Sequence, residues 1–280
     1  MKNNELADFI LKSLSEDIGN GDHSSLACIP SDAMGKAKLL VKEKGVIAGM
    51  RVAGVLFEVI DPDFLFEPLI EDGALVSPGD IAFYISGRQR SVLMAERLVL
   101  NIMQRMSGIA TSTYQYTSLL KGLKTKILDT RKTSPGLRFL EKEAVRIGGG
   151  MNHRMGLYDM IMLKDNHIDY SGGIENAIAR TRDYLAENNL DLKVEIEARN
   201  IEDVRRIIAA GGIDRIMLDN FGLKETIDAV NIIAGRYETE SSGGITIETV
   251  RSYAECGVDF ISVGALTHHI MSLDMSLKAV

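Results

Sequence analysis

Hydrophobic positions in the first third of the chain follow two different spacings. Leu6, Phe9, Ile10 and Leu14 recur at helical spacing, with acids on the other face, which predicts an amphipathic helix over residues 4–18. From residue 36 to residue 90 the pattern changes to short apolar runs broken by glycine-containing turns, with one helical pattern at 50–60. The short runs predict strands joined by hairpins, and they lie at 37–41, 46–48 and 81–85.

The longest helical pattern of the chain covers residues 91–123. Its apolar positions suit a buried helix that joins two parts of the protein, and the sequence Ser107-Gly108 predicts an interruption. Arg97 and Arg105 are the charged exceptions. From spacing alone, each is typical of a solvated or salt-bridged helix face.

After residue 124, apolar runs alternate with helical segments. The alternation predicts repeated β/α units and a parallel sheet. Such a sheet closes into a barrel or stays open and doubly wound, and glycine-rich turns after the last two strands favour the barrel. The predicted strands end near Asp129, Lys164, Glu197, Asp219, Glu240 and Gly264, and the helices lie at about 137–148, 174–188, 201–210, 223–235 and 246–256.

Composition and charge exclude several classes of protein. Hydrophobic residues make up 45% of the 280 positions and charged residues 25%, as in ordinary globular proteins. A net charge of −7 disfavours binding to nucleic acid or to an acidic membrane, because both need a basic face. Cys28 and Cys256 lie far apart outside any metal-binding pattern, so we interpret them as free thiols of a cytoplasmic protein. Neither a signal peptide nor a membrane span is indicated.

Basic residues are concentrated around the first two predicted barrel strands. Residues 129–167 hold seven lysines and arginines against five acids, although the chain as a whole is acidic. Arg131 and Lys132 follow the first strand, His153 and Arg154 precede the second, and Lys164 ends it. These side chains suit a ligand with carboxylates or phosphates. The alternative, in which surface acids neutralise each cation, stays open at this point.

Acidic residues follow on the next two strands. We interpret Glu195 and Glu197, in the sequence VEIEA, as lying on opposite faces of one strand, so that only one of them faces the barrel interior. Asp219 ends the next strand. Carboxylates at neighbouring strand ends bind sugar hydroxyls, hold Mg²⁺ or stabilise an oxocarbenium ion, and they are equally typical of a structural charge network.

Glycine-rich turns follow the last two predicted strands. The sequences SSGGI at 241–245 and VGALTHH at 263–269 each follow a strand, and we expect each to open a helix. Backbone amides at such a helix start form a phosphate cradle, and barrels commonly place one there. One short glycine turn is weak evidence, but two in these positions predict a phosphate site.

Several segments together resemble the quinolinate phosphoribosyltransferase family. The resemblance runs nearly end to end, and Lys164 within LYDMIMLKDNH favours the quinolinate enzymes over related ones. The segments are EDIGNGDHSS, AERLVLNIMQRMSGIAT, DTRKTSPGLR, GGGMNHRMGLYDMIMLKDNH, VEIEA, MLDNF, ESSGGI and GVDFISVGALTHH.

The resemblance implies a fold and a reaction. The fold is an N-terminal α/β sandwich domain over residues 1–110, with 270–280 packing against it, and an open, TIM-like α/β barrel over 111–269. The reaction is that of a pentosyltransferase of NAD biosynthesis, in which quinolinate and phosphoribosyl pyrophosphate give nicotinate mononucleotide, pyrophosphate and CO2. The resemblance also implies Mg²⁺, held mainly by the pyrophosphate, and a homodimer in which each site is completed by the neighbouring subunit.

The resemblance also implies roles for individual residues. Quinolinate is expected to bind at Arg131, His153, Arg154 and Lys164, together with Arg97 from the neighbouring subunit. Phosphoribosyl pyrophosphate and its metal are expected at Lys132, Glu197 and Asp219, and the 5′-phosphate at Ser242, Gly243, Gly264 and His268. Among these, Lys164, Glu197 and Asp219 are the expected catalytic residues. Arg199, after VEIEA, differs from the commonest family pattern, which leaves the choice between Glu195 and Glu197 open.

Three other functions compete with this one. The first is a molybdenum-associated relative that has the same fold. The second is a nicotinate phosphoribosyltransferase, whose substrate keeps its carboxylate. The third is a non-catalytic barrel that binds a phosphometabolite. Loss of Glu197 or Asp219 would favour the last of these, and both residues are present.

Overall fold

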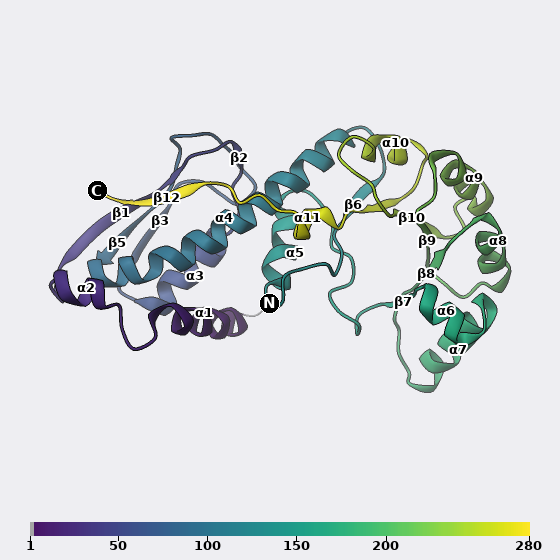
Figure 1. Ribbon diagram of the computed structural model, residues 1–280, viewed down its shortest axis with the longest axis horizontal. Helices are drawn as coiled ribbons and strands as arrows, with labels where there is room; N and C mark the ends of the chain where they lie inside the picture. Colours follow the sequence, from purple (N-terminus) through teal and green to yellow (C-terminus); the bar gives the residue numbers. More distant parts are fainter. Residues whose placement is uncertain (1–2) are drawn as a thin grey trace. The chain divides into compact units, whose positions relative to one another are not determined.

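The computed structural model describes residues 3–280 and divides into two compact units (Figure 1). The first contains the chain up to Tyr114, together with Phe139–Gly149 and His269–Val280. The second contains Gln115–Arg138 and Gly150–His268. Within residues 3–280, no helix is both long enough and apolar enough to cross a membrane.

The first unit is built on a four-stranded antiparallel sheet in the order β12-β1-β5-β3. The C-terminal strand β12 pairs with β1, placing Leu277 opposite Leu39. A separate two-stranded ribbon joins β2 to β4. The strands are β1 (Met34–Val41), β2 (Gly45–Val46), β3 (Leu65–Pro68), β4 (Leu75–Val76), β5 (Ile81–Arg88) and β12 (Met275–Ala279).

Aromatic and aliphatic side chains form the core of this unit. Phe57 packs against Phe64, Phe66 and Phe83 with ring centroids 5.5 Å apart in each pair, and Phe57 and Phe83 are fully buried. The expected first helix is confirmed as α1, which packs on α3. The helices are α1 (Asn3–Ile18), α2 (His23–Cys28), α3 (Met50–Ile60), α4 (Gln89–Leu119) and α5 (Arg138–Ile147).

The long helix α4 is continuous, so the interruption expected at Ser107-Gly108 is wrong. The Ser107 hydroxyl accepts a hydrogen bond from the Ala48 amide and donates one to the Ala48 carbonyl, both outside the helix. Gly108 serves close packing, because a Cβ atom there would lie 2.2 Å from the Met271 carbonyl oxygen. Tertiary contacts therefore account for the two residues that resemble a helix break.

Helix α5 belongs to the first unit, although its sequence position had placed it in the barrel domain. Phe139 packs edge-to-face on Phe9, and Glu141 forms an ion pair with Arg105 at 2.5 Å. Glu143 pairs with Arg51 at 2.8 Å. The barrel domain expected at 111–269 is therefore interrupted by this helix, and Arg105 is salt-bridged, as one interpretation of its spacing held.

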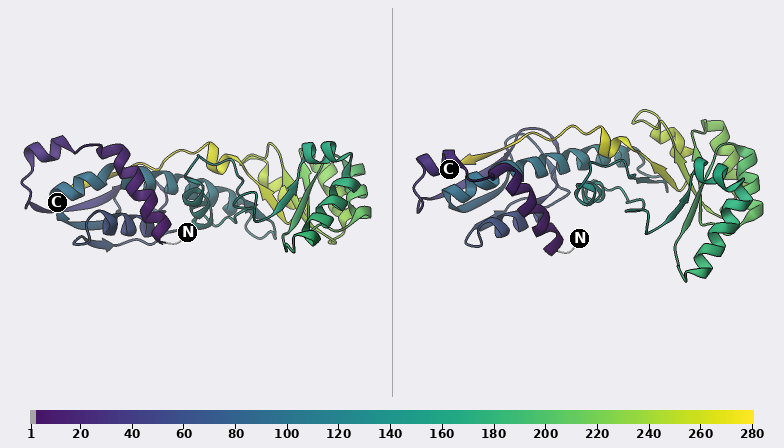
Figure 2. Two further views of the ribbon diagram at one scale, coloured as in Figure 1. Left: turned by 90° about the horizontal axis from the view of Figure 1, so that it is seen from below. Right: turned by 60° about the horizontal axis from the view of Figure 1, so that its bottom comes forward.

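The second unit is a six-stranded parallel sheet with helices α7, α8 and α9 along one side of it (Figures 1 and 2). Its order is β6-β11-β10-β9-β8-β7, and within residues 3–280 no strand pairing joins β6 to β7. The sheet is therefore the open form of an α/β barrel, as expected. The strands are β6 (Lys126–Leu128), β7 (Ile161–Leu163), β8 (Val194–Ala198), β9 (Arg215–Asp219), β10 (Glu238–Ser242) and β11 (Phe260–Ser262).

Helices α7, α8 and α9 of this unit follow the prediction, whereas α6 was not predicted. The segment expected to be helical at 246–256 is helical only in α10, because Thr246 to Thr249 form a turn closed by hydrogen bonds between those two residues. The helices are α6 (Asp165–Ser171), α7 (Ile174–Glu187), α8 (Ile201–Ala210), α9 (Leu223–Ile233), α10 (Val250–Glu255) and α11 (Ala265–His268).

Candidate active site

The carboxyl ends of the six parallel strands bring most of the expected site residues to one edge of the second unit. Since neighbouring strands run in the same direction, each pair of adjacent strand ends lies side by side. The order along this edge follows the sheet, not the chain: Arg131 and Lys132 after β6, Gly264 and His268 after β11, Ser242 and Gly243 at β10, Asp219 at β9, Glu197 at β8 and Lys164 after β7.

Asp129 fixes the start of the loop that carries His153 and Arg154. It is fully buried just after β6, and its carboxylate accepts hydrogen bonds from the His153 amide at 2.8 Å and from the Asn152 side chain at 2.5 Å. A further backbone bridge pairs Leu128 with Met151. The two basic segments at the first two strands, residues 131–132 and 153–154, are therefore tied together by one buried carboxylate.

Three cations of the basic cluster have no acidic partner in the described part of the chain. Among residues 3–280, no ion pair joins Arg131, Lys132 or Arg154 to a carboxylate, whereas surface arginines such as Arg206 are paired. Arg154 is only partly exposed, and one of its guanidinium nitrogens donates to the Met160 carbonyl at 3.1 Å. Unneutralised cations on one edge indicate a site for an anionic ligand, so neutralisation by surface acids does not explain these three residues.

The electrostatics of Arg154 support the same conclusion. Burial lowers the pKa of Arg154, and the nearby charge of Arg131 lowers it further, while Glu195 and Asp159 act in the opposite direction. An anion that contacts both guanidinium groups would stabilise the charge of Arg154.

Lys164 and Glu197 form a direct ion pair between the ends of β7 and β8. The lysine ammonium group donates a hydrogen bond to Glu197 Oε1, and the amide of Asp165 donates to Oε2 at 3.1 Å. Lys164 is partly exposed, whereas Glu197 is buried. Glu197 therefore neutralises this part of the cationic cluster, in contrast to Arg131 and Arg154.

The expectation that Glu195 and Glu197 lie on opposite faces of their strand is wrong. Residues two positions apart on a strand point to the same face, so both carboxylates face the same side of β8. Both are buried, but at different depths along the strand. Glu197 meets Lys164 near the strand end, while Glu195 lies one step deeper and meets His153.

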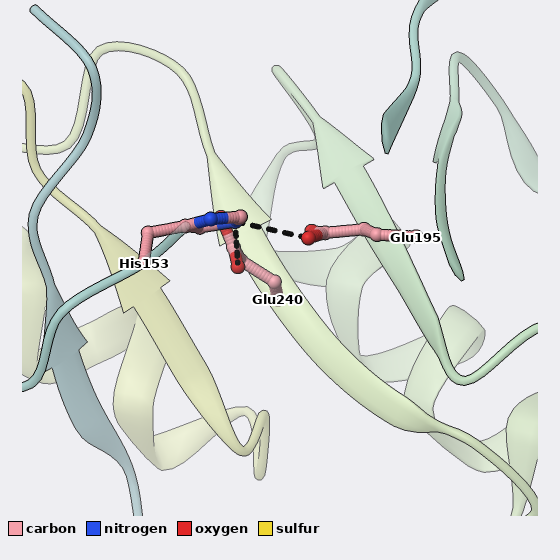
Figure 3. Close-up of side chains that lie close together, drawn as sticks. All are labelled: His153, Glu195 and Glu240. Atoms are coloured by element: carbon pink, nitrogen blue, oxygen red, sulfur yellow. Dashed lines mark ion pairs between the residues drawn. The ribbon is translucent and has the colours of Figure 1, made fainter. Parts of the chain in front are cut away.

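His153 lies over a buried pair of carboxylates (Figure 3). Its Nε2 atom lies 2.9 Å from Oε2 of Glu195 and 3.5 Å from Oε2 of Glu240, and both glutamates are fully buried. Burial alone would lower the pKa of His153, but the two carboxylates outweigh it and raise this pKa to about 9. Burial and the charge of Glu240 raise the pKa of Glu195 to about 7.

Arg215 supplies the positive charge on the other side of this pair. Its Nη1 atom donates to Glu240 at 3.0 Å and lies 3.9 Å from Glu195, while the rest of the guanidinium pairs with Glu238. Sequence reasoning named neither Arg215 nor Glu240 as a site residue. Arg215 carried a signal in the sequence, because it is a charged residue that opens the buried apolar run RIMLD. Glu240 lies in the polar strand ETESS and carried no such signal.

Asp219 and the first glycine turn meet at the ends of β9 and β10. Asp219 stands opposite Ser242 in the strand register, and its carboxylate accepts a hydrogen bond from the Asn220 side chain at 2.9 Å. The Asn220 amide donates to the Ser242 carbonyl at 2.8 Å. Gly243 has a φ of +97°, and a Cβ atom there would lie 2.2 Å from Asn220 Oδ1.

Gly243→Ala is therefore expected to raise the KM for the phosphate-bearing substrate at least tenfold, because the turn must shift away from Asn220. Gly235→Ala is the matched control, since Gly235 also has positive φ but nothing lies within 4 Å of its Cβ position. Steady-state kinetics and thermal melting of both variants would check this. Equal KM values for the two variants would show that the Gly243 turn does not shape the site.

The second glycine turn places three expected residues together. A Cβ atom at Gly264 would lie 3.1 Å from Lys132 Cδ and 3.2 Å from His268 Nε2, so these side chains flank the glycine. The Thr267 hydroxyl donates to the Lys132 carbonyl at 2.8 Å. The expectation that each turn opens a helix is confirmed for the second turn, which leads directly into the four-residue helix α11. It is wrong for the first turn, because a separate turn intervenes before α10 begins at Val250.

Arg97 lies in the first unit, unlike the other expected site residues. It is exposed on α4, and among residues 3–280 it has no ion pair with an acid.

Family models match almost the whole sequence. Residues 22–107 match the N-terminal domain of quinolinate phosphoribosyl transferase, and residues 109–278 match its C-terminal domain. The chain belongs to the quinolinate phosphoribosyltransferase family. The chloroplastic nicotinate-nucleotide pyrophosphorylase [carboxylating] of Arabidopsis thaliana is 45% identical over 98% of this chain and 82% of its own. A probable nicotinate-nucleotide pyrophosphorylase [carboxylating] of Synechocystis is 40% identical over 95% of this chain and 90% of its own.

Solved structures of family members agree with this fold. NadC from Streptococcus pyogenes superposes with a TM-score of 0.94 and 38% identity, covering 100% of this chain and 99% of its own. The nicotinate-nucleotide pyrophosphorylase of Francisella tularensis gives 0.93 and 37%, covering 100% and 98%. Human nicotinic acid phosphoribosyltransferase shares only the fold, at 15% identity and a TM-score of 0.63 over 92% of this chain and 72% of its own. Quinolinate phosphoribosyltransferases are therefore similar to this chain over its whole length, in sequence and in fold.

Proposed function

We propose that this protein transfers the phosphoribosyl group of phosphoribosyl pyrophosphate to quinolinate and removes CO2, giving nicotinate mononucleotide and pyrophosphate. Relatives 43–46% identical are named quinolinate phosphoribosyltransferase [decarboxylating] or nicotinate-nucleotide pyrophosphorylase [carboxylating]. The observation that carries the proposal is a group of three cations at the carboxyl ends of the barrel strands that have no acidic partner among residues 3–280: Arg131, Lys132 and Arg154.

Quinolinate carries two carboxylates, and this charge explains why the site has several cations. Arg131 and Arg154 offer planar guanidinium groups suited to bidentate binding of a carboxylate. His153 directly precedes Arg154 in the chain. Lys164 follows β7, which is the edge strand at the other side of the sheet from β6. Nicotinate has one carboxylate and would leave part of this charge uncompensated. The number of cations therefore favours a dicarboxylate over nicotinate.

In the proposed reaction, the pyridine nitrogen attacks C1 of the ribose while the bond to pyrophosphate breaks. Positive charge builds on the sugar during this step, and the carboxylates of Glu197 and Asp219, on adjacent strands, stabilise it. The bond from ring carbon 2 to its carboxylate then breaks, CO2 leaves, and the electron pair on carbon 2 takes up a proton. The Lys164 ammonium group stabilises the negative charge that develops on carbon 2.

The acidic residues at β8 and β9 suit Mg²⁺ bound mainly through pyrophosphate. Glu197 and Asp219 offer hard carboxylate oxygens, and Asp219 is only partly buried, so its side chain is accessible from the strand edge. Bound Mg²⁺ would neutralise charge on the departing pyrophosphate. Glu197 and Asp219 are the residues that would face it.

The proposed reaction is tested by supplying purified protein with quinolinate and phosphoribosyl pyrophosphate, with Mg²⁺ present, and measuring CO2 and nicotinate mononucleotide. Both products should appear in equal amounts. Nicotinate in place of quinolinate is the control. The predicted cytoplasmic location is a separate proposal, supported by two free cysteines, and it is tested by fractionation of cells.

We also propose a homodimer in which Arg97 completes the quinolinate site of the partner. Its exposure and its lack of an acidic partner among the described residues support this role. Arg97→Ala and Lys132→Ala should each be inactive alone. Mixed after subunit exchange, they should regain about a quarter of wild-type activity, because half of the chains enter mixed dimers and each mixed dimer has one intact site.

The exchange itself needs an independent measurement, such as fluorescence transfer between labelled subunits. Sustained inactivity of the mixture with exchange demonstrated would contradict the action of Arg97 across the interface. Arg180→Ala is a suitable partner in a control mixture, because Arg180 lies on α7, away from the expected site residues.

A further inference from the structure

The buried carboxylates beneath His153 are only partly compensated by hydrogen bonds. Neither oxygen of Glu195, nor Oε1 of Glu240, has a hydrogen-bond partner within residues 3–280, although both residues are fully buried. Burying a carboxylate this way is costly unless a charge lies nearby. The basic groups that pair with these carboxylates are His153 and Arg215, and the Ser262 hydroxyl also stabilises the charge of Glu240. The cluster of Glu195, Glu240 and Arg215 therefore favours one position of the His153 ring.

The orientation of the ring is fixed from its other side. The Arg154 amide donates a hydrogen bond to His153 Nδ1 at 2.6 Å. The other ring nitrogen, Nε2, faces the two carboxylates, which favour a proton on it. Although His153, Glu195 and Glu240 bring three ligand-type atoms within 4.8 Å, the arrangement does not suit a metal ion. A metal would need the lone pair of Nε2, and Arg215 already neutralises Glu240.

These contacts connect the buried cluster to Arg154. The His153 amide is held by Asp129, the ring is held by Glu195 and Glu240, and the ring nitrogen holds the amide of Arg154. The Arg154 side chain is fixed separately by its hydrogen bond to the Met160 carbonyl. A displaced ring would therefore move the backbone from which Arg154 projects.

We propose that Glu195 and Glu240 are positioning residues for quinolinate binding, which hold the His153 ring and, through it, the backbone of Arg154. This role rests on the proposed function, in which Arg154 contacts a quinolinate carboxylate. Arg215 orients Glu240, because its Nη1 atom donates a hydrogen bond to the Glu240 carboxylate at 3.0 Å. The guanidinium carbon of Arg215 is itself packed 4.0 Å from the centre of the Phe260 ring.

Glu240 gives the cleaner test, because Glu195 shares a strand with Glu197. Glu240→Gln keeps the shape and removes the charge that holds the ring. The KM for quinolinate should rise about tenfold, with the KM for phosphoribosyl pyrophosphate within twofold of the wild-type value. Glu238→Gln is the matched control: Glu238 lies on the same strand and pairs with Arg215, but among its described contacts none reaches His153.

Glu240→Asp provides a second test that retains the charge beside Arg215. Because the charge is retained, this variant should fold as the wild type does. Because its shorter side chain withdraws from the His153 ring, it should still show the raised KM for quinolinate. Equal rises of both KM values in folded variants would indicate a general loosening and overturn the proposal. An unchanged KM for quinolinate in both variants would also overturn it. Failure of the unchanged protein to use quinolinate would instead refute the proposed function.

Discussion

Lys164→Ala is expected to lower kcat about 10²–10³-fold at saturating concentrations of both substrates, the range seen when a preorganised electrostatic group is removed. The ammonium group lies at the end of β7, where it pairs with Glu197. In the proposed reaction it stabilises the charge on carbon 2 after CO2 leaves. Loss of that group would slow the chemical step, and steady-state kinetics with both substrates varied would measure the effect.

Lys193→Ala is the matched control for this variant. Lys193 lies just before β8, at the amino ends of the parallel strands, whereas Lys164 lies at their carboxyl ends. Lys193 forms a long ion pair of 3.9 Å with Glu238. Its kcat should stay within twofold of the wild-type value. If Lys164→Ala showed an intact kcat and only a raised KM for quinolinate, Lys164 would bind substrate without stabilising the carbanion, and the proposed catalytic role would be wrong.

Arg154→Ala is expected to raise the KM for quinolinate by roughly 10- to 100-fold, because a hydrogen bond to a charged group contributes about 1.5–3 kcal/mol. Arg154 is partly buried and, among the described residues, has no acid to neutralise it. The substrate carboxylate is its natural partner. The KM for phosphoribosyl pyrophosphate should change little, because Arg154 is not among the residues expected to bind that substrate, which are Lys132, Glu197, Asp219 and the two glycine turns.

Arg206→Ala is the control for general loss of an arginine. Arg206 lies on α8 and pairs with Glu175 at 2.6 Å in an exposed position, so its removal should leave both KM values unchanged. If Arg154→Ala had the same quinolinate KM as Arg206→Ala, Arg154 would not contact the substrate. The cation cluster would then need another explanation.

The sequence predicted the barrel strands and the residues at their ends well, and physical reasons explain this success. Runs such as Ile216 to Leu218 are apolar throughout because parallel strands are buried on both faces, and charge begins where the strand leaves the core. The cations after β6 and β7 were therefore visible as a local excess of charge.

Long-range contacts account for what the sequence did not predict. Helix α5 joins the first unit through three contacts that are distant in the sequence. Phe139 packs on Phe9. Glu143 pairs with Arg51, 92 positions away, and Glu141 pairs with Arg105, 36 positions away. The pairing of His153 with Glu240 likewise depends on which strands become neighbours. Local patterns carry no information on such partners, so the buried cluster became visible only in the folded chain.

The orientation of Glu195 and Glu197 could have been predicted correctly. The twofold period of a strand places both on one face, and only the depth along the strand separates their roles. Glu197 is near the edge with Lys164, and Glu195 is deeper with His153. The structure therefore assigns the edge position to Glu197, the residue that the family resemblance had favoured.

The central claim is that the cation cluster serves a dicarboxylate that loses CO2. The most direct measurement uses quinolinate labelled with ¹³C in the carboxylate at ring carbon 2, together with phosphoribosyl pyrophosphate and Mg²⁺. Our account predicts one labelled CO2 released for each nicotinate mononucleotide formed, with no comparable turnover of nicotinate. Nicotinate mononucleotide formed from nicotinate, with quinolinate left unchanged, would contradict it.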